Sequence, residues 1–456
     1  MSTTLTAVTD QNNTASPLKL STDSITNRGL ANEVGSTAYG TTALRSTTSG
    51  IDNTAVGYNA LNADTTGSSN TAVGHESLLL TTTASNNTAL GKHAGRFATT
   101  GGGNTAIGAL AMRLNSTGTG NTALGYVALE NNTNSNNTAL GYRSLRANTS
   151  GTYNVATGVD ALLSNSTGNY NTAIGGLALN SNTASNNTAV GYQAGYSNTS
   201  GNIIAIGYQA GRSNTTGINN TTIGQETLWS NVTGQDNTSV GYGALNQTNG
   251  SGNTAIGSKA NLYATSGNEN TSIGFNSGSS LSTSNNNTSL GAYSLKTNTG
   301  DNNVAIGHYA LFNNSSGTYN VAIGKDAIYQ NNGGIYNTGV GGSSLAQNTT
   351  GGRNVALGTD SLAANTTGSY NIGIGNRTQI NNLTGSSNIT IGYESNINGN
   401  FDASIAIGRS ATATASNQFV VGSAAYPAGT VVAGANVSSQ YWNVIINGTA
   451  YKILLA

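Results

Sequence analysis

Six carboxylates in this 456-residue chain occupy one position of a repeated pattern, two residues after a recurring glycine. They are Glu76, Asp160, Glu226, Asp326, Asp360 and Glu394. Glycoside hydrolysis needs two carboxyl groups about 5–10 Å apart, and Asp326 and Asp360 stand two repeats apart, near the upper end of that range. In other repeats the same position holds Asn59, Arg143, Gln193, Lys259 and Ser343. Such variety is typical of a solvent-facing position, so we expect no catalytic residue and no enzyme.

Aromatic side chains are the second group that could bind a ligand. The position directly after the recurring glycine holds Tyr58, Tyr126, Tyr142, Tyr192, Tyr208, Tyr242, Phe275 and Tyr393. Tyr126 and Tyr142 stand in consecutive repeats, as do Tyr192 and Tyr208, which predicts short ladders with rings about 5 Å apart. Ring faces on a polar surface can stack on sugars or recruit a protein, while rings at a corner also simply stabilise neighbouring strands. These four tyrosines, with Tyr441 and Trp442, are the predicted ligand-binding residues.

Neither a metal site nor a cofactor site is expected. The three histidines, His75, His93 and His308, are scattered along the chain, and we expect them on the surface, too far apart to meet at one metal. Cysteine is absent. Gly101-Gly102-Gly103 lacks the lysine and the strand–loop–helix setting of a phosphate-binding loop, so it is expected to form a turn.

Charge is scarce and balanced. Only 7% of residues are charged, with 16 basic and 16 acidic side chains, so nothing attracts a phosphate backbone or an anionic membrane. No run of about 18 apolar residues occurs, and Met1–Leu5 begins neither a basic nor an apolar leader. We therefore expect no nucleic-acid partner, no membrane insertion and no secretion signal.

A repeat must position all of these residues. The motif N-T-A-(V/I/L)-G recurs with its glycine at 40, 57, 74, 91, 108, 125, 141, 158, 175, 191, 207, 224, 241, 257, 274, 291, 307, 324, 341, 358, 375, 392 and 408. The steps of 16 or 17 residues are too short for paired helices and suit one flattened turn of a β-solenoid with two short strands. The sequence thus predicts an all-β protein, a parallel β-solenoid of about 23 coils.

Residues at one position of successive repeats form columns, and we assign these to faces by their alternation. Thr54 and Val56 represent two columns that are two residues apart and so share a face, which we expect to point into the coil together with the Leu61 column. The columns of Ala55 and Ala60 stay small, and we expect them to form outer surfaces for close packing. The Asn53 column either forms an amide ladder or merely tolerates a turn.

One coil alone is thin. Two or three buried aliphatic side chains contribute about 1.5–3 kcal/mol each, whereas ordering some 17 backbone residues costs roughly 1–2 kcal/mol apiece. Packing the small-residue face against identical neighbours would add contact area, and cyclic symmetry supplies such neighbours. We therefore predict a homotrimer, with a monomeric solenoid as the alternative.

The last repeats carry a resemblance to known fibres. Ser404–Ala413 reads SIAIGRSATA, and Asn417–Gly422 reads NQFVVG after a step of 14 residues. This step is similar to the repeat in the left-handed β-roll heads of trimeric autotransporter adhesins. The 16- and 17-residue repeats resemble more closely the shafts of bacteriophage and large-virus fibre proteins. The resemblance covers roughly residues 36–422.

Three regions follow from the repeat limits. Residues 36–422 are the predicted shaft. Residues 1–35 lack the repeat, and by resemblance to viral fibres they would bind an attachment protein of the virion; the alternative is a disordered leader. In 423–456, Asn447-Gly448 lies between two alternating apolar runs and predicts a hairpin, which we expect to close the trimeric shaft as a small C-terminal cap.

The resemblance implies a structural fibre on the outside of a virus particle, on a tail or a capsid. Such a fibre would contact a glycan or protein of the host surface. A bacterial trimeric adhesin head is the alternative. Ice binding is less expected, because it needs two outward threonine columns and the Thr54 column is expected to be buried. A tailspike depolymerase is also less expected, because it typically needs wider coils with a carboxylate-lined groove.

Overall fold

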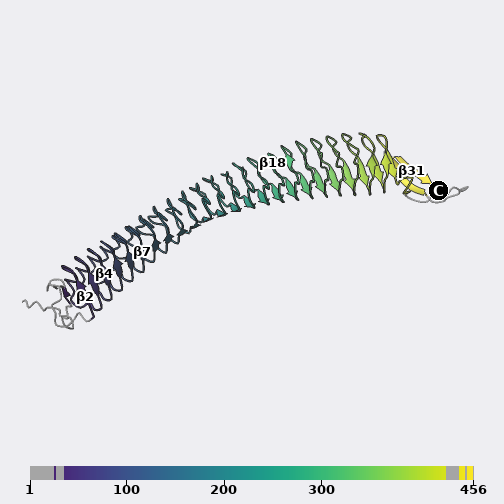
Figure 1. The fold of residues 1–456 in the computed structure, drawn as a ribbon. Coiled ribbons are helices and arrows are strands. Elements are labelled where there is room, and N and C mark those ends of the chain that lie inside the picture. Colours follow the sequence, from purple (N-terminus) through teal and green to yellow (C-terminus); the bar gives the residue numbers. More distant parts are fainter. Residues whose placement is uncertain (1–24, 27–34, 428–440, 447–448, 455–456) are drawn as a thin grey trace, which may run out of the picture. The chain divides into compact units, whose positions relative to one another are not determined.

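The computed structural model of the protein describes residues 25–26, 35–427, 441–446 and 449–454. The chain divides into two compact units, Met1–Asp301 and Asn302–Ala456. In each unit the chain winds as a parallel β-solenoid, with about 23 turns in all (Figure 1), which confirms the prediction of an all-β parallel solenoid. None of the described residues forms a helix that could cross a membrane.

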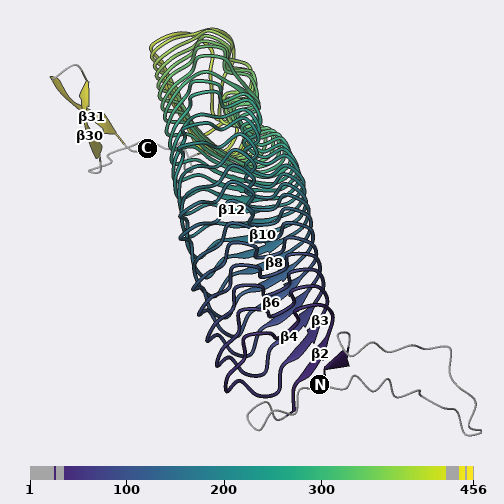
Figure 2. The same cartoon turned by 90° about the vertical axis from the view of Figure 1, so that its left-hand side faces the viewer.

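The strands of the first unit are short and regularly spaced. They are β1 (Ile25–Thr26), β2 (Thr37–Tyr39), β3 (Thr54–Val56), β4 (Thr71–Val73), β5 (Thr88–Leu90), β6 (Thr105–Ile107), β7 (Thr122–Leu124), β8 (Thr138–Leu140), β9 (Val155–Thr157), β10 (Thr172–Ile174), β11 (Thr188–Val190), β12 (Ile204–Ile206), β13 (Thr221–Ile223), β14 (Thr238–Val240), β15 (Thr254–Ile256), β16 (Thr271–Ile273), β17 (Thr288–Leu290) and β18 (Thr297–Asn298). The two-residue strand β1 pairs antiparallel with β2. The three-residue strands stack in parallel on one another (Figure 2).

The second unit follows the same plan and ends in a hairpin. Its strands are β19 (Val304–Ile306), β20 (Asn313–Asn314), β21 (Val321–Ile323), β22 (Thr338–Val340), β23 (Val355–Leu357), β24 (Ile372–Ile374), β25 (Ile389–Ile391), β26 (Asn396–Ile397), β27 (Ile405–Ile407), β28 (Thr412–Ala413), β29 (Phe419–Val421), β30 (Tyr441–Ile446) and β31 (Thr449–Leu454). β30 and β31 pair antiparallel around residues 447–448, as the Asn-Gly signal predicts.

The register between coils is the sequence period itself. Thr54 pairs with Thr71 and Val56 with Val73, one repeat later. The step of 14 residues is also one coil, because Ile405 pairs with Phe419. Each column of the sequence is therefore a continuous file of side chains along its unit, one coil spacing apart.

The motif glycine is required by contact between coils. Gly57 has a φ of 136°, a conformation that residues with a side chain rarely adopt. A Cβ at this position would lie 2.6 Å from the carbonyl oxygen of Gly74 in the next coil. The same contact recurs along the file, so the glycine column is set by backbone packing.

In most of the described coils the segment after the glycine is not a strand, and the exceptions are the two-residue strands β18, β20, β26 and β28. This corrects the prediction of two strands in each coil. Asn59 and Leu61 have φ values of 54° and 51°, in the left-handed region. This region breaks the extended geometry, although the backbone still bonds to the next coil, as from Leu61 N to Ser77 O at 3.0 Å. β-branched residues are disfavoured there, which explains why the Leu61 column is mostly leucine.

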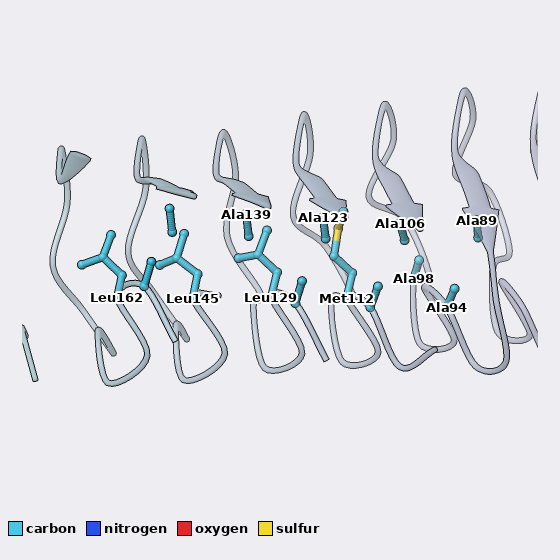
Figure 3. Packing of buried hydrophobic residues seen from close by; sticks show 14 of the residues in the cluster. Ala89, Ala94, Ala98, Ala106, Met112, Ala123, Leu129, Ala139, Leu145 and Leu162 are labelled. Carbon is cyan, nitrogen blue, oxygen red and sulfur yellow. The ribbon is translucent and has the colours of Figure 1, made fainter. Parts of the chain in front are cut away.

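The interior contains the small residues of the strands. Ala55 is fully buried, as are its equivalents Ala72, Ala89, Ala123, Ala139, Ala156 and Ala173. Figure 3 shows Ala123 and Ala139 on the strand side of the coil, with Met112, Leu129, Leu145 and Leu162 on the opposite side. The Leu61 column is thus in the core as expected, but the predicted faces of the strands are wrong. Thr54 and Val56 point outward, and the columns of Ala55 and Ala60 lie inside the single chain.

Buried asparagines form the amide ladder that was one of the two interpretations of their column. Asn53 is fully buried, and its Oδ1 accepts a hydrogen bond from the backbone N–H of Asn70 at 2.9 Å. Its Nδ2 donates to Gly67 O at 2.8 Å, which links the two sides of the coil. The left-handed residue of this turn is the preceding one, Asp52 with a φ of 58°. Tolerance of a turn therefore does not account for the asparagine.

Candidate functional site

The outward side chains of the strands form a regular surface, here named the strand face. It comprises, in each unit, the first and third residues of the three-residue strands. Its aliphatic column includes side chains that are 36% to 49% exposed: Leu90, Leu124, Leu140, Ile174, Ile206, Ile223, Ile256 and Leu290 in the first unit, and Ile323, Leu357, Ile374, Ile391 and Val421 in the second. The parallel column is mostly threonine, with Val155 and Ile204 at 38% and 41% exposure.

Such a surface is unusual for a chain on its own, because long contiguous apolar patches mark contact sites. Burying a whole aliphatic side chain contributes about 1.5–3 kcal/mol, so covering the exposed two fifths contributes about 1 kcal/mol for each coil. Repeated from β2 to β17, this reaches or exceeds the roughly 4–15 kcal/mol that association costs. The strand face can therefore hold a neighbouring molecule along its length.

Ice binding was less expected because the Thr54 column was predicted to be buried. That prediction is wrong, since these threonines point outward. Thr71 and Thr88 are exposed. The neighbouring outward column is aliphatic, however, so the strand face carries one threonine column and lacks the second that a T-x-T array needs.

The predicted tyrosine ladders are present. The rings of Tyr126 and Tyr142 stack with centroids 5.8 Å apart and 14° between their planes, and those of Tyr192 and Tyr208 stack at 5.8 Å and 20°. All four rings are 44% to 50% exposed. Arg143 lies over the Tyr142 ring at 5.0 Å. Their part in ligand binding stays a prediction.

Tyr441 and Trp442 are the first two residues of β30. Their side chains lie outside the described part of the structure. So does most of the predicted attachment segment, 1–35, of which only β1 and Gly35 are described.

Further aromatic files occur in two columns that the sequence analysis did not consider. Five residues before the motif glycine, Tyr153 stacks on Tyr170 at 5.4 Å and Tyr319 on Tyr336 at 5.0 Å. Five residues after the glycine, Phe312 stacks on Tyr329 at 5.2 Å and 3°. The signal was present in the repeat alignment, since aromatic residues recur there at the repeat spacing.

Four of the six carboxylates pair with basic side chains: Glu76, Asp160, Asp326 and Glu394. Arg143 donates from Nε and Nη2 to the two oxygens of Asp160, both at 2.7 Å, and this bond raises the pKa of Arg143. Asp160 is only 8% exposed. We expected this column to face solvent throughout, but it is partly buried. Four of its carboxylates form ion pairs with basic side chains of the same coil or of a neighbouring one.

Two histidines come together, contrary to the prediction that they are too far apart. The rings of His75 and His93 lie 5.4 Å apart on neighbouring coils, and one ligand atom of each, with one of Glu76, lie within 4.8 Å of one another. Imidazole and carboxylate donors suit a transition-metal ion. Arg96 Nε lies 2.9 Å from Glu76 Oε2, however, so a metal ion has to displace the guanidinium. Burial is the main cause that lowers the pKa of His93, and Glu76 opposes it.

One buried carboxylate belongs to none of these surfaces. Asp64 is fully buried, seven residues after the motif glycine, in a column that holds asparagine in most coils. Burial raises its pKa from 3.8 to about 7, although the bond that its Oδ1 accepts from Gly67 N at 3.0 Å lowers it. Asn53 Nδ2 lies 3.4 Å from the other oxygen, Oδ2.

Comparison with known proteins adds no family. No protein-family model matches the chain, and no curated protein sequence matches it significantly.

Proposed function

We propose that the chain is a structural fibre of a virus particle, assembled as a homotrimer through the strand face. The observation that carries this proposal is the outward aliphatic column, which runs from β3 onward in the first unit, with Thr157 as a polar interruption, and from β19 to β29 in the second. The small residues, which the sequence suggested as the contact surface, are enclosed within the single chain. We therefore assign the contact between chains to the strand face. In the trimer, the strand faces of three copies would point toward a common axis.

Several features support the rest of the proposal. The parallel solenoid with 16- and 17-residue coils is the architecture that the resemblance to viral fibre shafts implies. Residues 1–35 would bind an attachment protein of the virion, and the hairpin of β30 and β31 would cap the trimer. In this arrangement the protein lies on the virion surface and its outward side chains contact a glycan or protein of the host.

The second candidate is the head of a bacterial trimeric adhesin. One observation favours it: the 14-residue coil from Ile405 to Phe419, whose length resembles the adhesin-head repeat. This coil is confined to the last part of the solenoid. The longer coils before it favour the fibre.

The oligomeric state tests the assembly. Light scattering of the purified chain should give about three times 45.8 kDa. Replacing Leu124 and Leu140 by lysine should yield folded monomers, because both side chains are 42% exposed in one chain but covered in the trimer. A matched variant with Tyr126→Lys, outside the strand face, should remain trimeric. A wild-type protein of monomeric mass would contradict the proposed assembly.

The location tests the function. Antibodies raised against the purified chain should label virus particles, in immunogold electron microscopy of cultures of the source organism. Label on cell envelopes alone would instead support the adhesin.

A further inference from the structure

A pocket in the second unit lies where an aromatic stack stops. It has a volume of about 430 Å³ and is lined by Tyr309, Asp326, Tyr329, Gln330, Ala346 and Gln347. Volumes of this order are typical of sites for small molecules, which take roughly 300–1,000 Å³. The pocket is formed by three successive coils of this unit.

The stack explains why the pocket exists. Phe312 and Tyr329 occupy the same column, five residues after the motif glycine, and their rings are nearly parallel with centroids 5.2 Å apart. The next residue of the column is Ala346, followed by Ala363. A methyl group in the place of a ring leaves space over the face of Tyr329 that Phe312 does not cover. A third planar or ring-shaped group would continue the stack there.

Polar groups surround this space. Gln330 and Gln347 are exposed, and their side-chain amides make no hydrogen bond within the part of the chain that is described. The Asp326 carboxylate contributes acceptors, with Lys325 Nζ 3.6 Å from its Oδ2. A flat apolar ring face beside amide and carboxylate groups is complementary to a sugar, which presents C–H groups on one face and hydroxyls at its edge.

The walls are held in place before any ligand binds. The backbone N–H of Gln330 donates to Ala346 O at 3.0 Å, and that of Gln347 donates to Ala363 O at 3.1 Å. Tyr309 lies edge-on to Phe312 at 5.0 Å, which fixes the stack from the side. Binding therefore leaves the backbone and the rings as they are and orders chiefly the side chains of Gln330 and Gln347.

From these contacts we infer that the pocket binds an uncharged pyranose of a surface glycan, stacked on Tyr329 with its hydroxyls on Asp326, Gln330 and Gln347. The carboxylate disfavours acidic sugars, because their own charge would lie close to it. The inference names the ligand class for the host contact of the proposed fibre and rests on that function for its biological meaning. Sugar binding itself does not depend on the trimer.

The test is saturation-transfer difference NMR with the purified full-length chain. The probes are the methyl glycosides of glucose, galactose, mannose and N-acetylglucosamine, with sialic acid and glucuronic acid as charged comparisons. At least one uncharged glycoside should bind saturably, and Tyr329→Ala should weaken it tenfold or more. Binding of none of the uncharged probes, or of the acidic ones alone, would overturn the inference.

Two further variants separate loss of the site from loss of the fold. Ala346→Tyr should continue the stack, keep the thermal stability of the chain and abolish binding, because its ring occupies the place of the sugar. Tyr336→Ala removes a stacked ring of another file, outside the pocket, and should leave the affinity within about twofold. Unchanged binding in Ala346→Tyr would contradict the site. Light scattering measures the assembly independently of sugar binding. A monomer that binds the sugar would therefore refute the trimer but support the pocket.

Discussion

Asp64 makes the first unit sensitive to pH in a way that can be calculated. Its pKa is about 7 in the folded chain and 3.8 ordinarily, so between these values the folded state holds a proton that the unfolded state has released. The free energy of unfolding therefore falls as pH rises from about 4 to about 7, by about 1.4 kcal/mol for each pH unit, and then levels off. The total reaches about 4 kcal/mol as an upper limit, because coils can open locally without exposing the whole unit.

Asp64→Asn should remove this dependence. In equivalent coils an asparagine amide donates to the glycine carbonyl three residues on, as from Asn165 Nδ2 to Gly168 O at 3.0 Å. A carboxylate cannot make this bond, whereas the amide introduced by Asp64→Asn would supply the missing donor. The variant should therefore match the wild type near pH 4 and exceed its stability above pH 7. The difference should be up to about 4 kcal/mol, a factor of up to roughly a thousand in the opening equilibrium.

Hydrogen exchange of the coils around residue 64 measures the opening, with rates corrected for the intrinsic effect of pH. Protection in the wild type should fall between pH 4 and 7, while protection in Asp64→Asn should stay level. Asp52→Asn is the matched control, because Asp52 is an exposed carboxylate less than one coil before Asp64. Parallel pH profiles for wild type and Asp64→Asn would refute the assignment of a raised pKa to this carboxyl.

Two further predictions concern the interior and the charge files. Ile203 is fully buried in the asparagine column, and its Cδ1 would lie 3.1 Å from a Cβ placed on Gly211, which stands in the leucine column. Ile203→Asn and Gly211→Leu should each lower the free energy of unfolding by about 2–4 kcal/mol alone. The double variant should recover most of this loss, which a double-mutant cycle of urea unfolding measures. Glu130, whose side chain is 8% exposed, accepts from Arg113 at 3.0 Å and Arg146 at 2.9 Å, so Glu130→Gln should cost about 1–3 kcal/mol at low ionic strength. The loss should shrink at 1 M salt, and equal losses at both salt concentrations would contradict an electrostatic cause.

The period of the sequence was sufficient to predict the parallel solenoid and its register, because every coil repeats the same contacts with the next. The faces of the strands could not be assigned by hydrophobicity. At Gly339, an inward position of β22, a Cβ would already lie 2.8 Å from Ile328 Cγ1. So narrow an interior mostly holds glycine, alanine or serine at the inward position, although the larger Thr222, Thr390 and Val420 also occur there. Volume, rather than hydrophobicity, decides which side of the strand is buried.

The candidate sites were predictable to a different extent. The ladder of Tyr126 and Tyr142 follows directly from the repeat spacing, and it is present. The pocket exists because Ala346, the next residue of the column after two stacked rings, has no ring of its own. Side chains from two other columns complete the lining. That combination requires knowing which columns lie side by side across the turn, and the left-handed residues that set this arrangement are not visible in hydrophobic periodicity.

The outward aliphatic column then needs its own explanation. β-branched residues favour strands whatever they contact, so valine and isoleucine alone could reflect propensity. Leucine does not share this preference, yet Leu90, Leu124, Leu140 and Leu290 occupy the same column at 42% to 49% exposure. What the column has in common is apolar surface, and a chain that remained alone in water would gain nothing by keeping it. The proposed coverage by identical neighbours would account for the leucines as well as for the branched residues.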